Sequence, residues 1–231
     1  MTSQTALLEH YAALDSAAVS DALDALGLPP GQAGFLPVWG TPKIVGFAVT
    51  VQLEPYVPSP SGAHIGATAV AGADETNVIV VANDGRTDVS CWGGLLSLGA
   101  SLNGVLGVVA DGACRDVHEA RDIGFPVFAK GRIPATARGR LQQRSTGEPV
   151  RLGGVTVTPG DLVLADETGV AVVPHSHLEE VLERAQGVAA REQAIAAELR
   201  AGVALHEAMR DTRLAGTPET GTPESGITEE H

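Results

Sequence analysis

The sequence predicts an α/β domain, and three observations support this prediction. Residues 77–129 alternate between apolar runs rich in Val, Ile and Ala and amphipathic stretches, in the order strand, helix, strand, helix, strand. Hydrophobic residues make up 44% of the 231 residues, aromatic residues only 3%, and there are 28 glycines, which favours closely packed small side chains and many turns. Residues 150–174 then change to short apolar runs separated by turn residues, a pattern typical of β-hairpins.

The individual elements follow from local signals. Apolar residues at 19, 22, 23 and 26 give residues 16–26 one apolar face, with Ser16 as a hydroxyl cap and Gly27 as a stop. β-Branched residues indicate the first strand, and the second is expected to end at Asn83-Asp84-Gly85. The predicted helices are 16–26, 93–102 and 113–123, and the predicted strands are 43–53, 77–82, 105–110 and 126–129.

A long helix is expected after the hairpins. Ser176 and Glu179 have the spacing of a capping box, and an apolar stripe then continues to about Gly202. Glu192 falls within this stripe, where a carboxylate is costly unless it is paired or ligating. It is therefore either half of an ion pair at a subunit interface or an acid supplied to a site across that interface.

Three regions are expected along the chain. Residues 1–175 form the α/β domain, residues 176–210 form a helical extension that packs on a neighbouring subunit, and residues 211–231 form a disordered acidic tail in which Gly-Thr-Pro-Glu is repeated at 216 and 221.

Composition excludes several classes of function. The formal net charge of −13, with scattered Lys and Arg, argues against a nucleic-acid surface but allows a small anionic ligand. No apolar run approaches the ~20 residues that cross a bilayer, and the first residues lack the features of a signal peptide. Two cysteines indicate no disulfide framework. We expect a soluble cytoplasmic protein with no membrane or nucleic-acid partner.

The main candidate site follows the buried strand at 105–110. Arg115 is a candidate bidentate clamp for a carboxylate, and Asp116 is a candidate oxygen ligand for a divalent ion. If residues 113–123 are helical, Glu119 lies one turn along on the face of Asp116 and can hold a metal-bound water. The alternative is a surface ion pair with acids that favour the helix dipole.

A second candidate lies at the start of the helix at 93–102. Gly93-Gly94-Leu95 offers backbone N–H groups to an anion, although a tight turn that only needs glycine is equally open. Cys114 is either a thiolate beside a positive charge or, more simply, a buried inert cysteine. The remaining polar candidates are expected to have structural roles. We expect Asp166-Glu167 to form a solvated turn and Asp84 and Asp88 to act as capping groups. His64, His118, His175 and His177 lack the spacing of metal ligands.

Several motifs occur in an order that resembles the RraA-like family, over roughly residues 10–205. They are Val19-Ser20-Asp21-Ala22-Leu23, Gly93-Gly94-Leu95-Leu96, the run 104–112, Arg115-Asp116-x-x-Glu119, the run 124–129 and the run 160–166. The family includes regulators of ribonuclease E activity and class II 4-hydroxy-4-methyl-2-oxoglutarate / 4-carboxy-4-hydroxy-2-oxoadipate aldolases.

The resemblance implies an α/β/β sandwich that resembles a phosphohistidine domain, with a long C-terminal helix, assembled as a trimer or hexamer with sites between subunits. It implies a lyase that uses Mg²⁺ or Mn²⁺, cleaves a 4-hydroxy-2-oxo acid to pyruvate and a second 2-oxo acid, and decarboxylates oxaloacetate. Arg115 and Asp116 match the catalytic pair; Arg115 binds the pyruvoyl carboxylate, with backbone contacts from Gly94, Leu95 and Leu96. Asp116 matches the direct metal ligand, and Glu119 and the neighbouring subunit's Glu192 match acids that act through water.

The sequence departs from part of this family at one position. Some of its aldolases carry Asp with twenty residues between it and the Arg, at the position where this chain has Gly94, so Glu119 would supply the missing carboxylate. A non-catalytic regulator that binds a ribonuclease or helicase remains the alternative function. The sequence has no Gly-x-Gly-x-Gly loop that would favour a methyltransferase.

Overall fold

The computed structural model describes residues 3–58 and 64–210. Its helices are α1 (Gln4–Ala12), α2 (Ser16–Ala25), α3 (Ala67–Gly72), α4 (Gly94–Leu102), α5 (Val117–Asp122), α6 (Leu178–Arg200) and α7 (Leu205–Ala208). Its strands are β1 (Leu36–Pro37), β2 (Ile44–Pro55), β3 (Asn77–Trp92), β4 (Gly107–Cys114), β5 (Val127–Arg132), β6 (Leu141–Thr146), β7 (Val150–Leu152), β8 (Val155–Val157), β9 (Leu162–Ala165) and β10 (Val170–Val173).

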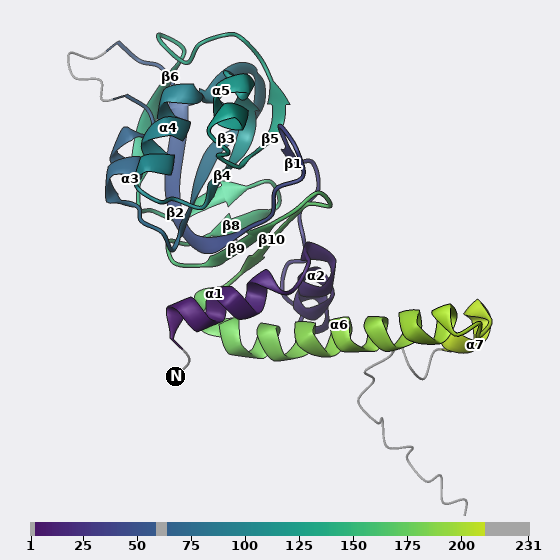
Figure 1. The fold of residues 1–231 in the computed structure, drawn as a ribbon. Helices are drawn as coiled ribbons and strands as arrows, with labels where there is room; N and C mark the ends of the chain where they lie inside the picture. Colours follow the sequence, from purple (N-terminus) through teal and green to yellow (C-terminus); the bar gives the residue numbers. More distant parts are fainter. Residues whose placement is uncertain (1–2, 59–63, 211–231) are drawn as a thin grey trace, which may run out of the picture. The chain divides into compact units, whose positions relative to one another are not determined.

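One large curled sheet carries most of these strands in the order β1-β5-β4-β3-β2-β9-β10, with β6 also paired to β2 (Figure 1). β2, β3, β4 and β5 are mutually parallel neighbours, and α3, α4 and α5 connect them in turn. This confirms the strand–helix alternation over residues 77–129. The hairpins expected at 150–174 are β7–β8 and β9–β10.

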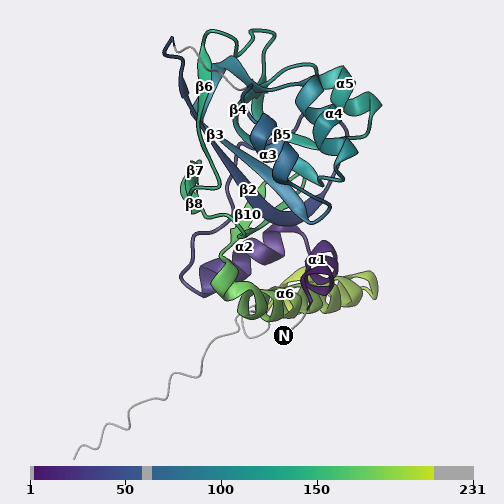
Figure 2. The same ribbon diagram turned by 90° about the vertical axis from the view of Figure 1, so that its left-hand side faces the viewer.

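The sheet is covered on both faces. Helices α3, α4 and α5 lie together on one face in both views, over a cluster that includes Ile79, Val108 and Phe125 (Figures 1 and 2). The β7–β8 hairpin covers the opposite face, over a second cluster that includes Phe35, Val109 and Leu152. Successive strand residues point to opposite faces, so Val108 and Val109 belong to different cores. The predicted α/β/β arrangement with a long C-terminal helix is confirmed.

Two strands are longer than the sequence predicts. β3 does not end at Asn83-Asp84-Gly85 but continues to Trp92, and β4 continues through Asp111-Gly112 to Cys114. Asp84 and Gly85 both have positive φ, and the β3–β4 register shifts between Ala82 and Arg86, as at a β-bulge. The turn residues therefore change the direction of β3 without ending it. The second half of β3 then runs toward the start of α4.

The helix starts also differ from the expected ones. α2 is capped by Asp15, whose carboxylate accepts from the Ala18 N–H at 2.8 Å, and not by Ser16. α5 begins at Val117 and not at 113, because β4 extends to Cys114 and Asp116 has a left-handed φ of 57°. α6 begins at Leu178, after a 3₁₀ turn that contains Ser176, so the capping box does not form as predicted.

The chain divides into two units, residues 1–188 and residues 189–231. In the first, the start of α6 is tied to α1 by a 2.8 Å hydrogen bond from the Tyr11 hydroxyl to the Leu178 carbonyl. The described part of the second holds the rest of α6 and the short α7. The expected tail at 211–231 lies outside the described residues. Among residues 3–58 and 64–210, no helix has the length and apolarity to cross a membrane.

Candidate functional site

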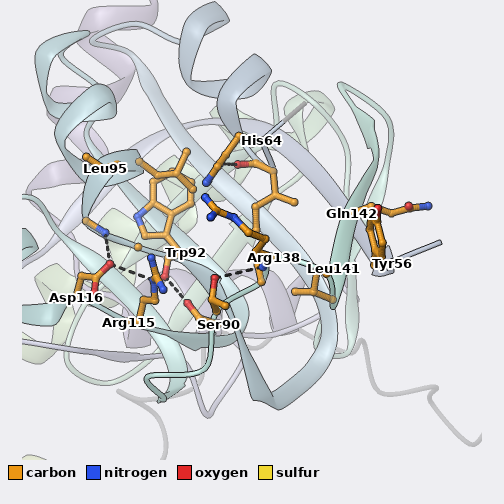
Figure 3. Close-up of a pocket in the computed structure, with 17 residues that line it drawn as sticks. Tyr56, His64, Ser90, Trp92, Leu95, Arg115, Asp116, Arg138, Leu141 and Gln142 are labelled. Carbon is orange, nitrogen blue, oxygen red and sulfur yellow. Dashed lines mark hydrogen bonds and ion pairs between the residues drawn. The ribbon is translucent and has the colours of Figure 1, made fainter. Parts of the chain in front are cut away.

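A cavity of about 580 Å³ lies where β3 and β4 end and α4 begins (Figure 3). It is lined by Tyr56, His64, Ile65, Ser90, Trp92, Gly93, Gly94, Leu95, Leu96, Arg115, Asp116, Thr136, Ala137, Arg138, Gly139, Leu141 and Gln142. Ligand sites of open α/β sheets form at this place, beyond the carboxyl ends of the parallel strands. The structure therefore brings five of the sequence-predicted residues, Gly94, Leu95, Leu96, Arg115 and Asp116, to one cavity.

A backbone hydrogen bond fixes the position of Arg115 at the end of β4. Its N–H donates to the Trp92 carbonyl at 3.0 Å, which continues the β3–β4 pairing by one residue. Its Nε lies 3.1 Å from Asp116 Oδ2, and the two side chains are 40% and 31% exposed. Such a half-exposed pair contributes at most about 1 kcal/mol to folding stability. The pair is therefore better explained by what the cavity binds than by the stability of the fold.

Asp116 is held in an uncommon backbone conformation. Its φ of 57° is left-handed, which Asp tolerates better than most residues and which turns the chain sharply into α5. The same Oδ2 that pairs with Arg115 accepts from the Gly94 N–H at 3.2 Å. Asp116 thus joins the end of β4 to the start of α4, and it faces the cavity beside Arg115 (Figure 3).

The Gly93-Gly94 turn has two close side-chain neighbours that a β-carbon would displace. A β-carbon on Gly93 would lie 3.1 Å from Asp116 Oδ2, and one on Gly94 would occupy the space of the Glu119 carboxylate. Leu95 and Leu96 follow in the first turn of α4, where N–H groups have no intrahelical acceptor. The Leu95 and Leu96 N–H groups are therefore available beside the Arg115 guanidinium, whereas the Gly94 N–H already donates to Asp116 Oδ2.

A hydrogen-bonded floor supports this turn. Trp92 Nε1 donates to Ser97 Oγ at 2.9 Å, Ser97 Oγ donates to the Gly93 carbonyl at 3.2 Å, and Ser90 Oγ donates to the Trp92 carbonyl at 2.7 Å. The Trp92 ring also stacks on Phe125, with ring centroids 6.4 Å apart. Because these groups are buried, the position of the turn is fixed before any ligand arrives.

Glu119 and Glu192 are not brought into the cavity. Glu119 is exposed on α5 and lies against Gly94, behind the turn and outside the cavity lining. Glu192 is exposed on α6 in the second unit, and the buried residues of that helix end at Ala185. The roles expected for the two acids remain predictions.

The residues that could hold a metal are therefore few. Among the described residues, no group of three or more His, Cys, Asp or Glu is placed to surround an ion. Asp116 Oδ2 and the Glu119 carboxylate lie near the β-carbon positions of Gly93 and Gly94, but only Asp116 lines the cavity. Mg²⁺ is commonly held by one or two carboxylates, with water and substrate supplying the other ligands, so Asp116 could serve as the direct protein ligand of such an ion.

Sequence reasoning missed the other wall of the cavity. Tyr56 follows β2, Arg138 belongs to the segment between β5 and β6, and Gln142 lies in β6. His64 also lines this wall, although it is excluded as a metal ligand by spacing alone. β6 pairs antiparallel with β2 across a long connection, and this non-local pairing is what places the wall beside Arg115. No local motif signals such a pairing.

The other polar candidates have structural roles. Asp166 is not a freely solvated turn residue: its two carboxylate oxygens accept from the Ser16 N–H and Oγ, each at 2.7 Å. Asp88 pairs with Arg86 at 2.9 Å. Cys114 is buried, and burial raises the pKa of its thiol to about 11. This favours a buried inert cysteine over a reactive thiolate.

Comparison with known proteins identifies the fold and the family. The RraA-like family, described as aldolase/RraA, matches residues 16–172. The chain belongs to the RraA-like family. A relative from Halalkalibacterium halodurans, named as a proposed 4-hydroxy-4-methyl-2-oxoglutarate aldolase, is 30% identical over 81% of this chain and 85% of its own length. Protein DlpA of Legionella pneumophila is 34% identical over 89% of this chain, which spans only 33% of DlpA.

Solved structures agree with this assignment. An uncharacterised protein from Pseudomonas syringae pv. tomato has a TM-score of 0.81 at 32% identity, over 89% of this chain and 98% of its own. Streptomyces coelicolor RraAS2, described as an unusual member of the RNase ES inhibitor RraA family, has a TM-score of 0.76 at 28% identity, over 84% and 97% of the two chains. The family thus contains relatives named as aldolases and a relative named for ribonuclease inhibition, and the aldolase names support a lyase at a coarse level.

Proposed function

We propose that this RraA-like protein is a divalent-metal-dependent aldolase that cleaves 4-hydroxy-2-oxo acids, such as 4-hydroxy-4-methyl-2-oxoglutarate, to pyruvate and a second 2-oxo acid. One observation carries the proposal. A guanidinium and a carboxylate, at Arg115 and Asp116, line one cavity together with Leu95 and Leu96, whose backbone N–H groups have no intrahelical acceptor. This is the donor set that a 2-oxo carboxylate requires, because carboxylates are bound by guanidinium forks and by helix N-termini.

In the proposed complex, the substrate carboxylate lies between Arg115 and the N–H groups of Leu95 and Leu96. Arg115 then also stands beside the 2-oxo group, where negative charge develops. The Trp92–Ser97 hydrogen bond supports this proposal, because donors on a turn that it holds in place would need little reorganisation during the reaction. The interaction is stronger with an enolate than with a neutral ketone, which is the condition for catalysis rather than simple binding.

The bond changes follow from this placement. The 4-hydroxyl group loses its proton to a carboxylate or to a water oriented by one, and the C3–C4 bond breaks as the new carbonyl forms at C4. The electron pair passes to C3 and the 2-oxo oxygen as the enolate of pyruvate, which Arg115 stabilises, and a proton returns to C3. Oxaloacetate loses CO₂ to give the same enolate without a hydroxyl proton to remove, so decarboxylation is the more tolerant activity.

The proposed metal ion would be held by Asp116, with Glu119 acting through water. A bound Mg²⁺ or Mn²⁺ would supply Lewis-acid stabilisation and a template for the 2-oxo acid. Asp116 also keeps its contacts to Gly94 and Arg115, so it orients the guanidinium as well. In a proposed trimer or hexamer, Glu192 of an adjacent subunit would complete this group of acids.

The test is metal-dependent release of pyruvate. Purified protein is incubated with 4-hydroxy-4-methyl-2-oxoglutarate or oxaloacetate, and pyruvate is measured with lactate dehydrogenase. We expect activity with both substrates, loss of activity in EDTA and recovery with Mg²⁺ or Mn²⁺. Absence of metal-dependent pyruvate release from both substrates and from other 4-hydroxy-2-oxo acids would contradict the proposal.

A second candidate function is a non-catalytic regulator that binds a ribonuclease or helicase. It is supported by the relationship to RraAS2 and by an exposed apolar row on α4, where Leu95, Leu98 and Leu102 are 79%, 43% and 78% exposed. The same row would equally serve contact between copies of this chain. The pyruvate assay separates the two functions, since a regulator needs no turnover.

A further inference from the structure

The cavity contains a second guanidinium besides that of Arg115. Arg138 lines it from the segment between β5 and β6, and Figure 3 shows this exposed side chain directed toward His64 and Trp92. Arg115 and Asp116 line the same cavity just after the end of β4 (Figure 3). The two arginines therefore approach one cavity from elements that are far apart in the fold.

The charges of the two arginines are balanced differently. Arg115 is paired with Asp116 at 3.1 Å, and Arg86 and Arg121 are paired with Asp88 and Asp122, each at 2.9 Å. Within residues 3–58 and 64–210, Arg138 has no carboxylate within ion-pair distance. The sequence between Pro58 and His64 adds none, since residues 59–63 contain no Asp or Glu. The cavity therefore has an excess of positive charge where Arg138 lines it.

The backbone around Arg138 is well fixed. The Ala137 carbonyl accepts from the Arg140 and Leu141 N–H groups at 2.9 and 2.8 Å, and the Arg138 N–H lies 3.3 Å from Thr136 Oγ1. The Ala135 carbonyl accepts from the Ser90 N–H at 2.9 Å, which ties this segment to β3 beside the floor of the cavity. The direction in which Arg138 leaves the chain is thus set by the fold.

The cavity has room for more than a three-carbon acid. Its volume of about 580 Å³ lies within the ~300–1,000 Å³ range of pockets that hold much larger ligands. A pyruvoyl group at the Gly94–Leu96 turn would leave space toward Arg138, where the remainder of the substrate must lie. A carboxylate at that end would meet a guanidinium that no protein carboxylate pairs, whereas a methyl group would gain no ionic contact with this exposed side chain.

We propose that Arg138 is a specificity-determining residue that binds the second carboxylate of a dicarboxylic 2-oxo acid while Arg115 binds the first. The proposal rests on the proposed function for the Arg115 end of the cavity. It goes beyond that function by naming the residue that selects substrates by the charge of their far end.

The experiment compares two substrates that differ at that end. The variant is Arg138→Ala, and the matched control is Arg140→Ala, since exposed Arg140 lies on the same segment, does not line the cavity and uses Nη1 to donate to the Thr136 carbonyl. Values of kcat/KM for pyruvate release are measured with 4-hydroxy-4-methyl-2-oxoglutarate, which has two carboxylates, and with 4-hydroxy-2-oxopentanoate, which has one.

We expect Arg138→Ala to lower kcat/KM for the dicarboxylate about 10- to 100-fold, as for the loss of a charged hydrogen-bond partner, and to change it less than about twofold for the monocarboxylate. Arg140→Ala should leave both values near those of the parent protein. Equal losses with both substrates, or no loss with the dicarboxylate, would overturn the assignment of Arg138.

A binding measurement keeps this test separate from the aldolase test. Calorimetric titration of the metal-loaded protein uses 2-oxoglutarate and 2-oxopentanoate, which differ only by the distal carboxylate. We expect the parent protein to prefer 2-oxoglutarate about 10-fold or more and Arg138→Ala to lose this preference. A parent protein that shows the preference without releasing pyruvate would contradict the aldolase function and support Arg138. A parent protein with no preference would overturn the role of Arg138 whether or not pyruvate is released.

Discussion

The Glu119 carboxylate occupies the space that a β-carbon on Gly94 would need. Gly94 begins α4 and Glu119 lies in the first turn of α5, so the two helix starts are packed against each other at the edge of the cavity. This contact favours glycine at position 94 while Glu119 keeps its present position. A side chain at position 94 and the present position of Glu119 exclude each other.

We therefore predict that Gly94→Ala acts on the site through Glu119. The flexible end of Glu119 can move away, so the protein should stay folded, but the carboxylate leaves its place beside the turn and pyruvate release should fall at least about tenfold. In a double-mutant cycle, Gly94→Ala should have little further effect when Glu119 is already alanine. Gly99→Ala, in the same helix as Gly94, is the control, because its β-carbon would make only ordinary contact, 3.4 Å from Val70 Cγ1 of α3. Fully additive losses would contradict this coupling.

Substitution of the Arg115–Asp116 pair should separate activity from stability. We predict that Arg115→Ala and Asp116→Asn each lower pyruvate release by about 10²-fold or more, as expected for groups that stabilise developing charge. Asn is chosen at 116 because it tolerates the left-handed backbone better than Ala. Melting temperatures should change by only a few degrees, since the pair is half exposed. Arg86→Ala, which breaks another exposed pair, serves as the control. Near-parental turnover in either site variant would refute the site assignment.

The sequence predicts some parts of the fold and the cavity and not others. The glycine turn, the charged end of β4 and the strand–helix alternation depend on neighbours within a few residues, and the sequence predicts them. The far wall of the cavity depends on the pairing of β6 with β2, for which no local signal exists, so Arg138 was missed. The start of α5 differs from the predicted one because β4 continues to Cys114 and because Asp116, which contacts the distant Gly94, has a left-handed backbone.

The free energy of unfolding should depend on pH through the Asp166 carboxylate. Burial alone would raise its pKa, but hydrogen bonds from Ser16, Thr168 and Gly169 outweigh burial and hold the pKa below the ordinary value of 3.8. Its contribution is therefore fully present above the unfolded-state pKa of about 3.9 and is lost as the pH falls through the lower folded-state value. We predict that Asp166→Ala lowers the free energy of unfolding by about 1–3 kcal/mol at pH 7, because the buried N–H of Ser16 loses its acceptor.

The measurement for Asp166 is urea unfolding of the parent protein and of Asp166→Ala between pH 7 and pH 3. The difference between them should shrink below about pH 4 as the parent carboxylate is protonated. Glu167→Ala is the matched control, since Glu167 is the adjacent exposed acid. A difference that stays constant down to pH 3 would show that the ionised carboxylate is not the stabilising group.

The two cysteines should be unreactive in the folded protein. Burial raises the pKa of the Cys114 thiol to about 11 and that of Cys91 to about 12, so almost no thiolate is present at pH 8. We predict slow reaction with a thiol-specific disulfide reagent until denaturant is added, after which both thiols react. Cys114→Ser should keep near-parental pyruvate release even though it directly precedes Arg115. Rapid modification of the native protein with loss of activity would instead indicate a functional thiol.

Glu192 offers a test of whether the site is shared between subunits. Its exposure on α6, past the last buried residue of that helix, leaves it free to serve a neighbouring copy. If Glu192 of one subunit completes the site of another, Glu192→Ala and Arg115→Ala should each be nearly inactive alone. In mixed oligomers, however, some sites would combine an intact Arg115 with an intact Glu192 from the adjacent subunit.

We predict that unfolding the two inactive variants together at equal concentration, followed by refolding, restores about a quarter of the parental activity, the fraction expected from random assembly of a ring. The control mixes Arg115→Ala with Asp116→Asn: both changes affect the same subunit's part of the site, so no combination yields an intact site. Recovery in the control, or no recovery with Glu192→Ala despite co-assembly shown by size-exclusion chromatography of differently tagged chains, would contradict a site shared through Glu192. Retention of full activity by Glu192→Ala alone would remove Glu192 from the site altogether.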